Sequence, residues 1–365
     1  MIIFTSICAN YLHKARTLAD SVKKHMPDAT FIVCLVEREI REEFKYASFD
    51  RIVLAKDAWE GNFNRFIYKH TIVEASTAVK GQFFRYLFSS YPDENEFVYL
   101  DPDTYVYADF VELKEMLKSR PIVVCPHLLE PGNIDMELSS TAHGVYNLGF
   151  LAVNHSDEAK RFIDWWAERL YLFCYDDILK GVFTDQKWID LAPCFFDVQI
   201  CKHHGYDFAT WSLMNCDMTV EDNIYKVHGD PLRFIHFSGY GKVIENCMNN
   251  WLPAGDHPFR DLYKVYSLEH EKNDGDRISK TIWSYATYES GEKIDDSLRL
   301  KYRMDYDLMF SIENPFALSN SEMKRRISGE ETAGGFKAKL KKAVRAFREE
   351  GAVALLKKIW KKIVG

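Results

Sequence analysis

The sequence lacks the features that define several classes of protein. Its eight cysteines are scattered, and no two of them form a C-x-x-C pair, so neither a zinc site nor a disulfide framework is indicated. No apolar run reaches the roughly 18 residues of a membrane-spanning helix, and the opening Met-Ile-Ile-Phe lacks the basic region of a signal peptide. We therefore expect free buried thiols and a cytoplasmic protein.

The charge is unevenly distributed along the chain. The net charge of −7 argues against general nucleic-acid binding, yet residues 336–365 hold ten of the 47 basic residues and only two of the 54 acidic ones. With 47% hydrophobic and 15% aromatic residues, the 365-residue chain is long enough for one large catalytic domain with an appendage, or for two domains.

Hydrophobic periodicity predicts alternating strands and helices over the first two thirds of the chain. Strands are expected at residues 2–8, 29–36, 51–54, 97–100, 121–126, 149–153 and 234–237, and helices at 11–24, 66–88 and 158–173. This alternation favours a parallel sheet with helices on both faces. Residues 252–327 show no clean periodicity, and we assign no elements there.

An apolar strand at residues 97–100 runs directly into Asp101-Pro102-Asp103. Side chains two residues apart in an extended chain point to the same side, so both carboxylates can converge on one cation. Oxygen ligands favour Mg²⁺ or Mn²⁺. Ligands of open α/β sheets bind at the carboxyl ends of the strands, where these acids are expected. The alternative is a solvated turn, which Asp and Pro also favour.

Further motifs follow in a fixed order: Tyr-Asn-Leu-Gly-Phe at 146–150, Thr-Asp-Gln at 184–186, and His-Phe-Ser-Gly at 236–239 with Lys242 close behind. Together with the two acids they resemble the GT-A glycosyltransferases, in particular the retaining group that includes glycogenin and the lipopolysaccharide galactosyltransferases. The resemblance covers about residues 2–242. It implies a Rossmann-like mixed α/β sheet flanked by helices.

The resemblance implies that Asp101, Asp103 and His236 are the protein ligands of a divalent ion. That ion would bridge the two phosphates of a nucleotide sugar, most simply a UDP-sugar, and stabilise charge on the leaving nucleoside diphosphate. An imidazole beside two carboxylates favours Mn²⁺ over Mg²⁺. A lone histidine can equally be a structural residue.

The resemblance also implies the remaining donor contacts. Those to the nucleotide and diphosphate are expected from Thr5, Ala9, Asn10, Tyr11, Lys80, Arg85, Pro102, Gly149, Gly239 and Lys242. Asn147, Asp185 and Gln186 are expected to orient the donor sugar and stabilise the reacting centre. The alternatives are a packing role for Tyr11, a snorkelling side chain for Arg85 and a solvated lysine in a turn for Lys242.

Two departures from the family pattern bear on the chemistry. The Pro-Trp that often follows the family's Gly-Lys is absent after Lys242, and Lys187 stands where an acid commonly follows Asp-Gln. Donor identity and retention of configuration are therefore less firmly implied than the metal site.

The basic C-terminal segment has an amphipathic pattern. Apolar residues of 355–364 recur at helical spacing with pairs of lysines between them, a pattern typical of helices that bind anionic membrane surfaces. The alternative is a helix packed on the acidic body of the protein. We expect a catalytic domain at 1–250, an extension at 251–327 that completes the acceptor side, a linker at 328–335 and membrane-associating helices at 336–365.

These observations predict a metal-dependent glycosyltransferase, peripherally attached to the inner face of the membrane, that acts on a glycan or glycolipid in bacterial surface polysaccharide synthesis. One rival is a nucleotidyltransferase acting on sugar phosphates, but the loop after the first strand, Cys8 to Tyr11, lacks the glycine-rich basic signature of such enzymes. The other is a non-catalytic, membrane-recruited binding module with a transferase-like fold.

Overall fold

The computed structural model describes residues 1–275 and 277–329. These form two compact units, one built from 1–57 and 76–282, the other from 58–75 and the residues from 283 onward. The expected membrane-associating segment lies outside the described residues. Of the expected linker, Ser328 ends the helix α13 (Asn320–Ser328) and Gly329 caps it in a left-handed conformation. None of the described helices is both long and apolar enough to cross a membrane.

A seven-stranded mixed sheet forms the centre of the first unit, in the order β10-β6-β7-β4-β1-β2-β3. Its strands are β1 (Ile2–Ile7), β2 (Thr30–Leu35), β3 (Arg51–Leu54), β4 (Glu96–Leu100), β6 (Ile122–Pro126), β7 (Tyr146–Asn154) and β10 (Val198–Ile200). The mixed α/β class is thus confirmed. The simpler expectation of a parallel sheet is wrong at β7, which runs antiparallel to both β4 and β6.

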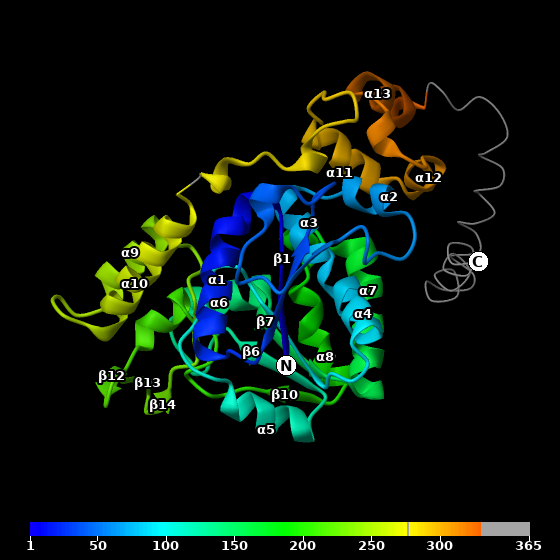
Figure 1. Cartoon of the computed structure of the whole chain (residues 1–365). Helices are drawn as coiled ribbons and strands as arrows, with labels where there is room; N and C mark the ends of the chain where they lie inside the picture. Colours follow the sequence, from blue (N-terminus) through cyan, green and yellow to red (C-terminus); the bar gives the residue numbers. More distant parts are fainter. Residues whose placement is uncertain (276, 330–365) are drawn as a thin grey trace. The chain divides into compact units, whose positions relative to one another are not determined.

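Helices cover both faces of this sheet, because its strands are apolar on both sides. Ile3 of β1 belongs to the core that α1 (Leu12–His25) and α5 (Val111–Ser119) complete. The next residue, Phe4, points to the other face and packs against Phe83 and Phe84 of α4 (Lys80–Ser90). There α4 lies beside α7 (Asp157–Phe173) (Figure 1).

A second sheet of three short strands, β11-β15-β5, stands at the carboxyl end of β4. It contains β5 (Thr104–Val106), β11 (Phe208–Ala209) and β15 (Phe234–His236). Because β5 and β15 pair antiparallel with His236 opposite Thr104, the chain returns at His236 to the aspartates that follow β4.

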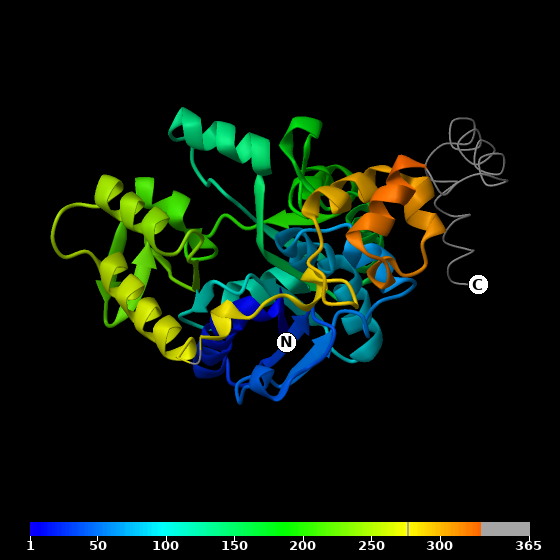
Figure 2. The same ribbon diagram turned by 90° about the horizontal axis from the view of Figure 1, so that it is seen from above.

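A separate apolar cluster covers this second sheet. It is formed with α9 (Lys242–Trp251), α10 (Pro258–Asn273) and the strands β12 (Met218–Glu221), β13 (Ile224–Val227) and β14 (Asp230–Pro231). In Figure 2 these helices, in yellow, and strands, in green, lie together. Tyr266 of α10 stacks on Phe237 at 4.0 Å between ring centroids, which anchors the segment directly after His236.

The remaining elements of the first unit are short. They are α6 (Ile134–His143), α8 (Ala192–Phe195), β8 (Asp176–Asp177), β9 (Val182–Phe183), and 3₁₀ turns at Ala9–Tyr11, Glu42–Phe44, Ile178–Lys180, Lys187–Leu191, Thr210–Asn215 and Ile278–Lys280.

The second unit is helical. It contains α2 (Phe63–Tyr68), α11 (Asp296–Met304), α12 (Tyr306–Ser311), α13 and 3₁₀ turns at Ser284–Ala286 and Pro315–Ala317, while α3 (Ile72–Ala78) spans the junction. Arg303 donates to both carboxylate oxygens of Glu74, at 2.9 and 3.0 Å, in a buried ion pair. The expected boundary at 250/251 between a catalytic domain and an extension stays a prediction. The compact units divide at 282/283 because α10 packs on α1, where Arg16 donates to the Asn273 carbonyl.

Gly81 permits the close approach of α4 and α7. A Cβ added to Gly81 would lie 2.7 Å from the Cα of Ala167, a backbone atom that cannot rotate away. Gly81→Ala gains about 1 kcal/mol of helix propensity but overpacks the contact at a cost of about 1–3 kcal/mol. We predict a net loss of unfolding free energy, measured by urea denaturation.

The matched control is Ser89→Ala, on the exposed side of α4. A Gly81→Ala variant more stable than the wild type would show that the two helices separate without cost and would contradict the close packing.

Candidate metal centre and its surroundings

Three potential metal ligands converge where β4 and β15 end. Oxygen atoms of Asp101 and Asp103 and a ring nitrogen of His236 all lie within 4.8 Å of one another. His236 Nε2 is 3.2 Å from Asp103 Oδ1 and 3.8 Å from Asp101 Oδ2. A turn closed by Thr104 N–H donating to the Asp101 carbonyl, at 3.1 Å, sets the two acids side by side. The predicted metal residues are therefore brought together.

This cluster suits a positive charge. Burial alone would lower the pKa of His236, but its close contact with Asp103 and its attraction to the carboxylates of Asp207 and Asp101 outweigh burial and raise that pKa to about 10. Two carboxylates and one imidazole are also a common donor set for Mn²⁺ and related ions. The residues present thus fit the divalent ion that the sequence implied.

A chain of hydrogen bonds fixes which nitrogen of His236 faces the acids. His127 Nδ1 lies 3.3 Å from the Val145 carbonyl and so carries a proton, which leaves its Nε2 to accept from the Asn147 amide at 3.1 Å. Asn147 Oδ1 is then an acceptor, for Gly149 N–H at 2.8 Å and for His236 Nδ1–H at 3.2 Å. Nε2 of His236 is left free to bind a metal ion.

Gly149 is required by the packing around this histidine. An added Cβ would lie 2.5 Å from both Asn147 Oδ1 and His236 Cε1. The glycine of the predicted Asn-Leu-Gly motif therefore makes room for the metal-facing imidazole, and its expected contact with the donor stays a prediction.

Lys80 is the central cation of the site. Its ammonium group is buried, 2.9 Å from Asp185 and 3.4 Å from Asp101, and donates to the Leu148 carbonyl at 2.9 Å. It also lies 3.9 Å from the centre of the Tyr99 ring, whose hydroxyl donates to Asp101 at 2.5 Å. Burial would lower the pKa of Lys80, but the nearby acids raise it well above its usual value.

Lys14 approaches the acids from α1. Its ammonium group lies 3.3 Å from Asp103 and 4.5 Å from the centre of the Tyr11 ring. Burial would lower its pKa, but Asp103 raises it. Lys14 thus lies between the acids and the ring of Tyr11, which is 38% exposed. The predicted contact of Tyr11 with the nucleotide base needs such an accessible ring.

Asp185 and Gln186 lie beside β7. Asp185 is buried against Lys80, and the side chain of Gln186 accepts from Leu148 N–H at 3.0 Å and donates to the His143 carbonyl at 3.2 Å. Lys80 thus holds Asp185, and the backbone of Leu148 and His143 holds Gln186, while their orienting role stays a prediction.

Arg85, predicted to contact the donor, binds other side chains of the protein in this structure, and the donor contact stays a prediction. Its guanidinium binds the side chain and carbonyl of Asp164 on α7, at 2.7 and 3.1 Å, and Gln82 on its own helix. Five residues separate Arg85 from Lys80, which places the two about 140° apart around α4. Arg85 therefore joins two helices, while Lys80 faces the acids.

Of the other predicted residues in the first strand and its loop, Thr5 and Ala9 are buried and Asn10 is half-buried. Thr5 lies within β1, and neither its hydroxyl nor the side-chain oxygen of Asn10 has a hydrogen-bond partner among the described residues. Ala9 N–H donates to Glu37 at 2.9 Å. These positions are compatible with the predicted ligand contacts, which stay predictions.

The predicted phosphate contacts lie in the turn after His236. Gly239 and Gly241 have φ angles of +74° and +94°, which glycine adopts without strain. Lys242 is exposed as the first residue of α9, where free backbone N–H groups favour an anion. Pro102 is buried between the two acids.

Sequence reasoning missed Lys14, Tyr99, His127 and Asp207. Tyr99 could have been found, since it stands two residues before Asp101 and so shares its side of the strand, and Lys14 is one helical turn after Tyr11. His127 and Asp207 reach His236 through tertiary structure and carry no local signal.

Comparisons with known proteins give limited guidance. No family model matches the chain. Among Bacillus subtilis proteins it is similar to the uncharacterized YfnF, with 31% identity over 183 residues, 46% of this chain and 57% of YfnF. It is also similar to the uncharacterized YfnD, with 20% identity over 250 residues, 67% of this chain and 79% of YfnD. The match thus spans little more than half the length of YfnF.

The solved structures that the chain resembles are glycosyltransferases, as the sequence resemblance implied. The galactosyltransferase LgtC, in complex with donor and acceptor sugar analogs, matches 74% of this chain and 96% of its own, with 16% identity and a TM-score of 0.46. GlyE of Streptococcus pneumoniae matches 77% and 65%, with 14% identity and a TM-score of 0.42. Because TM-scores of this size do not establish a shared fold, the function depends on the site itself.

Gly149→Ala tests the packing around the candidate metal ligand. The added methyl group must displace His236 or Asn147, so we expect at least about tenfold weaker Mn²⁺ binding, comparable to the loss of a residue that orients a ligand. Isothermal titration with Mn²⁺ measures the affinity, and circular dichroism checks the fold.

Gly275→Ala is the control, since its added Cβ meets one atom at an ordinary 3.4 Å. Unchanged Mn²⁺ affinity in a folded Gly149→Ala protein would mean that His236 does not bind the ion.

Proposed function

We propose that this protein is a metal-dependent glycosyltransferase that uses a nucleotide diphosphate sugar, most simply a UDP-sugar. The observation that carries the proposal is the Asp101, Asp103 and His236 cluster flanked by two lysines. Two carboxylates with one imidazole fit Mn²⁺. Further positive charge for phosphates would come from Lys14, Lys242 and the amino terminus of α9. Tyr11 offers a stacking surface for the base.

The bound ion would stabilise negative charge on the departing nucleoside diphosphate. The chain's own residues position the groups around that charge. Lys80 holds Asp101 and Asp185 in place, and the hydrogen-bond chain through His127 and Asn147 fixes the ring of His236.

Retention of configuration is part of the proposal. The carboxylate of Asp185 is buried against Lys80 at 2.9 Å, which favours positioning over attack as a nucleophile. A front-face reaction, in which the leaving phosphate takes the acceptor proton, needs no strong protein base and suits this arrangement.

The proposed acceptor is a glycan or glycolipid of bacterial surface polysaccharide synthesis. The support is the basic amphipathic sequence of residues 336–365, which lies outside the described part of the structure. Attachment of this segment to the inner face of the membrane would place the enzyme beside a lipid-linked acceptor.

Calorimetric titration of UDP and GDP, with Mn²⁺ and with EDTA, tests the donor site. We expect UDP binding that requires Mn²⁺ and that Asp103→Ala weakens at least about 100-fold, since loss of a metal ligand should cost no less than loss of an orienting residue. Asp109→Ala is the control, a surface aspartate paired with Lys114.

Failure of both nucleotides to bind under any condition would refute the transferase proposal and favour the binding-module rival. Sugar-phosphate turnover with a nucleoside triphosphate would favour the nucleotidyltransferase rival.

Flotation of the full chain with liposomes tests membrane attachment. We expect the protein to float with vesicles containing phosphatidylglycerol and not with neutral ones. Replacing Lys357, Lys358, Lys361 and Lys362 by glutamine should abolish flotation, since each lysine near an anionic surface contributes about 1 kcal/mol. Equal flotation of the variant would show that the lysines are not the attachment site.

A further inference from the structure

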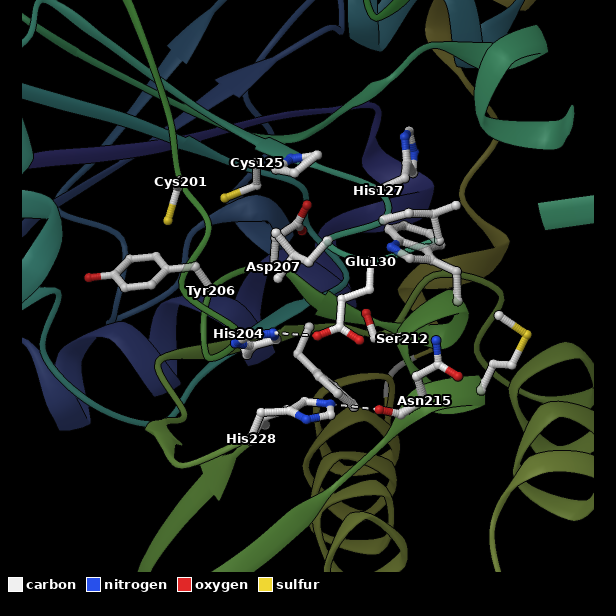
Figure 3. A pocket seen from close by; sticks show the side chains of 17 residues that line it. Cys125, His127, Glu130, Cys201, His204, Tyr206, Asp207, Ser212, Asn215 and His228 are labelled. Carbon is white, nitrogen blue, oxygen red and sulfur yellow. Dashed lines mark hydrogen bonds and ion pairs between the residues drawn. The ribbon is translucent and has the colours of Figure 1, made fainter. Parts of the chain in front are cut away.

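A pocket lies behind the candidate metal ligand, on the side of His236 away from the acids. It is lined by residues of β6 and the loop after it, of 201–215 and of β13 (Figure 3). Its internal volume of about 60 Å³ accommodates a few water molecules. It can therefore take several hydroxyl groups of one sugar, but not an entire oligosaccharide.

Buried polar atoms in this lining lack hydrogen-bond partners. Asp207 is 3% exposed, and neither of its carboxylate oxygens accepts a hydrogen bond from any described residue. His236 Nδ1 lies 3.6 Å from Asp207 Oδ1, beyond hydrogen-bond distance. The indole N–H of Trp211 is also buried without an acceptor among the described residues. Because unpaired buried polar groups cost free energy, both are ready to bind a ligand's hydroxyl groups.

The charge of the lining limits the class of ligand. Asp207 and Glu130 contribute carboxylates, and Glu130 lies 3.9 Å from His204 (Figure 3). Among the described residues that line the pocket there is no lysine or arginine. A phosphate or a uronic acid would thus meet carboxylates without a full cationic partner, whereas a neutral sugar offers hydroxyl donors to the acids and oxygen acceptors to the indole.

The pocket is also close enough to the metal centre to take part in transfer. Only the imidazole of His236 separates them, with Nε2 facing the acids and Nδ1 facing Asp207. The ring of Trp211 lies edge-on to that imidazole, at 5.8 Å between centroids.

We propose that this pocket binds the terminal sugar of the acceptor and that this sugar is a neutral pyranose. Its acceptor role rests on the proposed transferase function. Trp211 provides the ring face and one donor, Asp207 accepts from buried hydroxyl groups, and Glu130 accepts from a hydroxyl group at the pocket mouth.

Saturation-transfer NMR on the full chain tests the proposal. The probes are methyl glycosides of glucose, galactose, mannose, rhamnose and the two N-acetylhexosamines, with methyl glucuronide as the anionic comparison, each with and without Mn²⁺ and UDP. We expect a neutral glycoside to bind together with UDP and the glucuronide not to bind.

Two variants localise the binding. Trp211→Phe keeps a ring but removes the unpaired N–H, and Glu130→Gln removes a carboxylate at the mouth. Each should weaken glycoside binding about tenfold, the effect of one lost hydrogen bond, and leave the affinity for UDP with Mn²⁺ unchanged. Trp188→Phe is the matched control, since that indole N–H donates to the Phe173 carbonyl at 3.3 Å.

The possible failures are distinguishable. Four results would overturn the pocket assignment while metal-dependent UDP binding stood. These are absence of neutral glycoside binding, equal binding of the glucuronide, competition between glycoside and UDP-sugar, and unaffected binding in both variants. Glycoside binding that the two variants weaken, without any nucleotide binding, would overturn the proposed transfer reaction and the acceptor role but keep the sugar pocket.

Discussion

The site depends on neutralising carboxylates that the fold brings together in partly buried surroundings. Asp101, Asp103, Asp185 and Asp207 all approach the end of β4, and among the described residues Lys80, Lys14 and His236 lie close enough to offset their charge. Buried charges are tolerated when they are paired and hydrogen-bonded. The arrangement thus suits a bound cation, and a divalent ion would offset the carboxylate charge that the lysines leave.

The fold supplies this arrangement through two sheets that meet at one edge. β4 delivers the two aspartates at its carboxyl end, and β15 returns antiparallel to β5 so that His236 faces them. On the far side, β7 supplies Asn147 and Gly149, which orient the imidazole. The acids and Asp207 therefore face different ring nitrogens of the same histidine.

Much of this could be predicted from sequence because the signals are local. Asp101 and Asp103 are two residues apart after an apolar strand, and most strands of the first 155 residues follow simple periodicity. The single helix expected at 66–88 is wrong, because the structure has three helices there, α2, α3 and α4, and the helices α5 and α6 were not predicted. The direction of β7 could not be read, since a buried strand has the same pattern in either orientation. Asp207 and His127 reach the site only through tertiary contacts. The motif around Arg85 did not tell which side of its helix faces the acids, and the structure shows this side chain bound to Asp164. The segment 252–327 was unassigned because one long helix, α10, and several short helices are divided between two units.

The central claim is that one divalent ion binds between Asp101, Asp103 and His236 and bridges to the diphosphate of a nucleotide. Crystals grown with Mn²⁺ and UDP, with anomalous diffraction recorded at the manganese absorption edge, test it most directly. The account predicts a single strong anomalous peak coordinated by these three side chains and by two phosphate oxygens of UDP. A manganese peak elsewhere, or bound UDP without metal at this cluster, would contradict it.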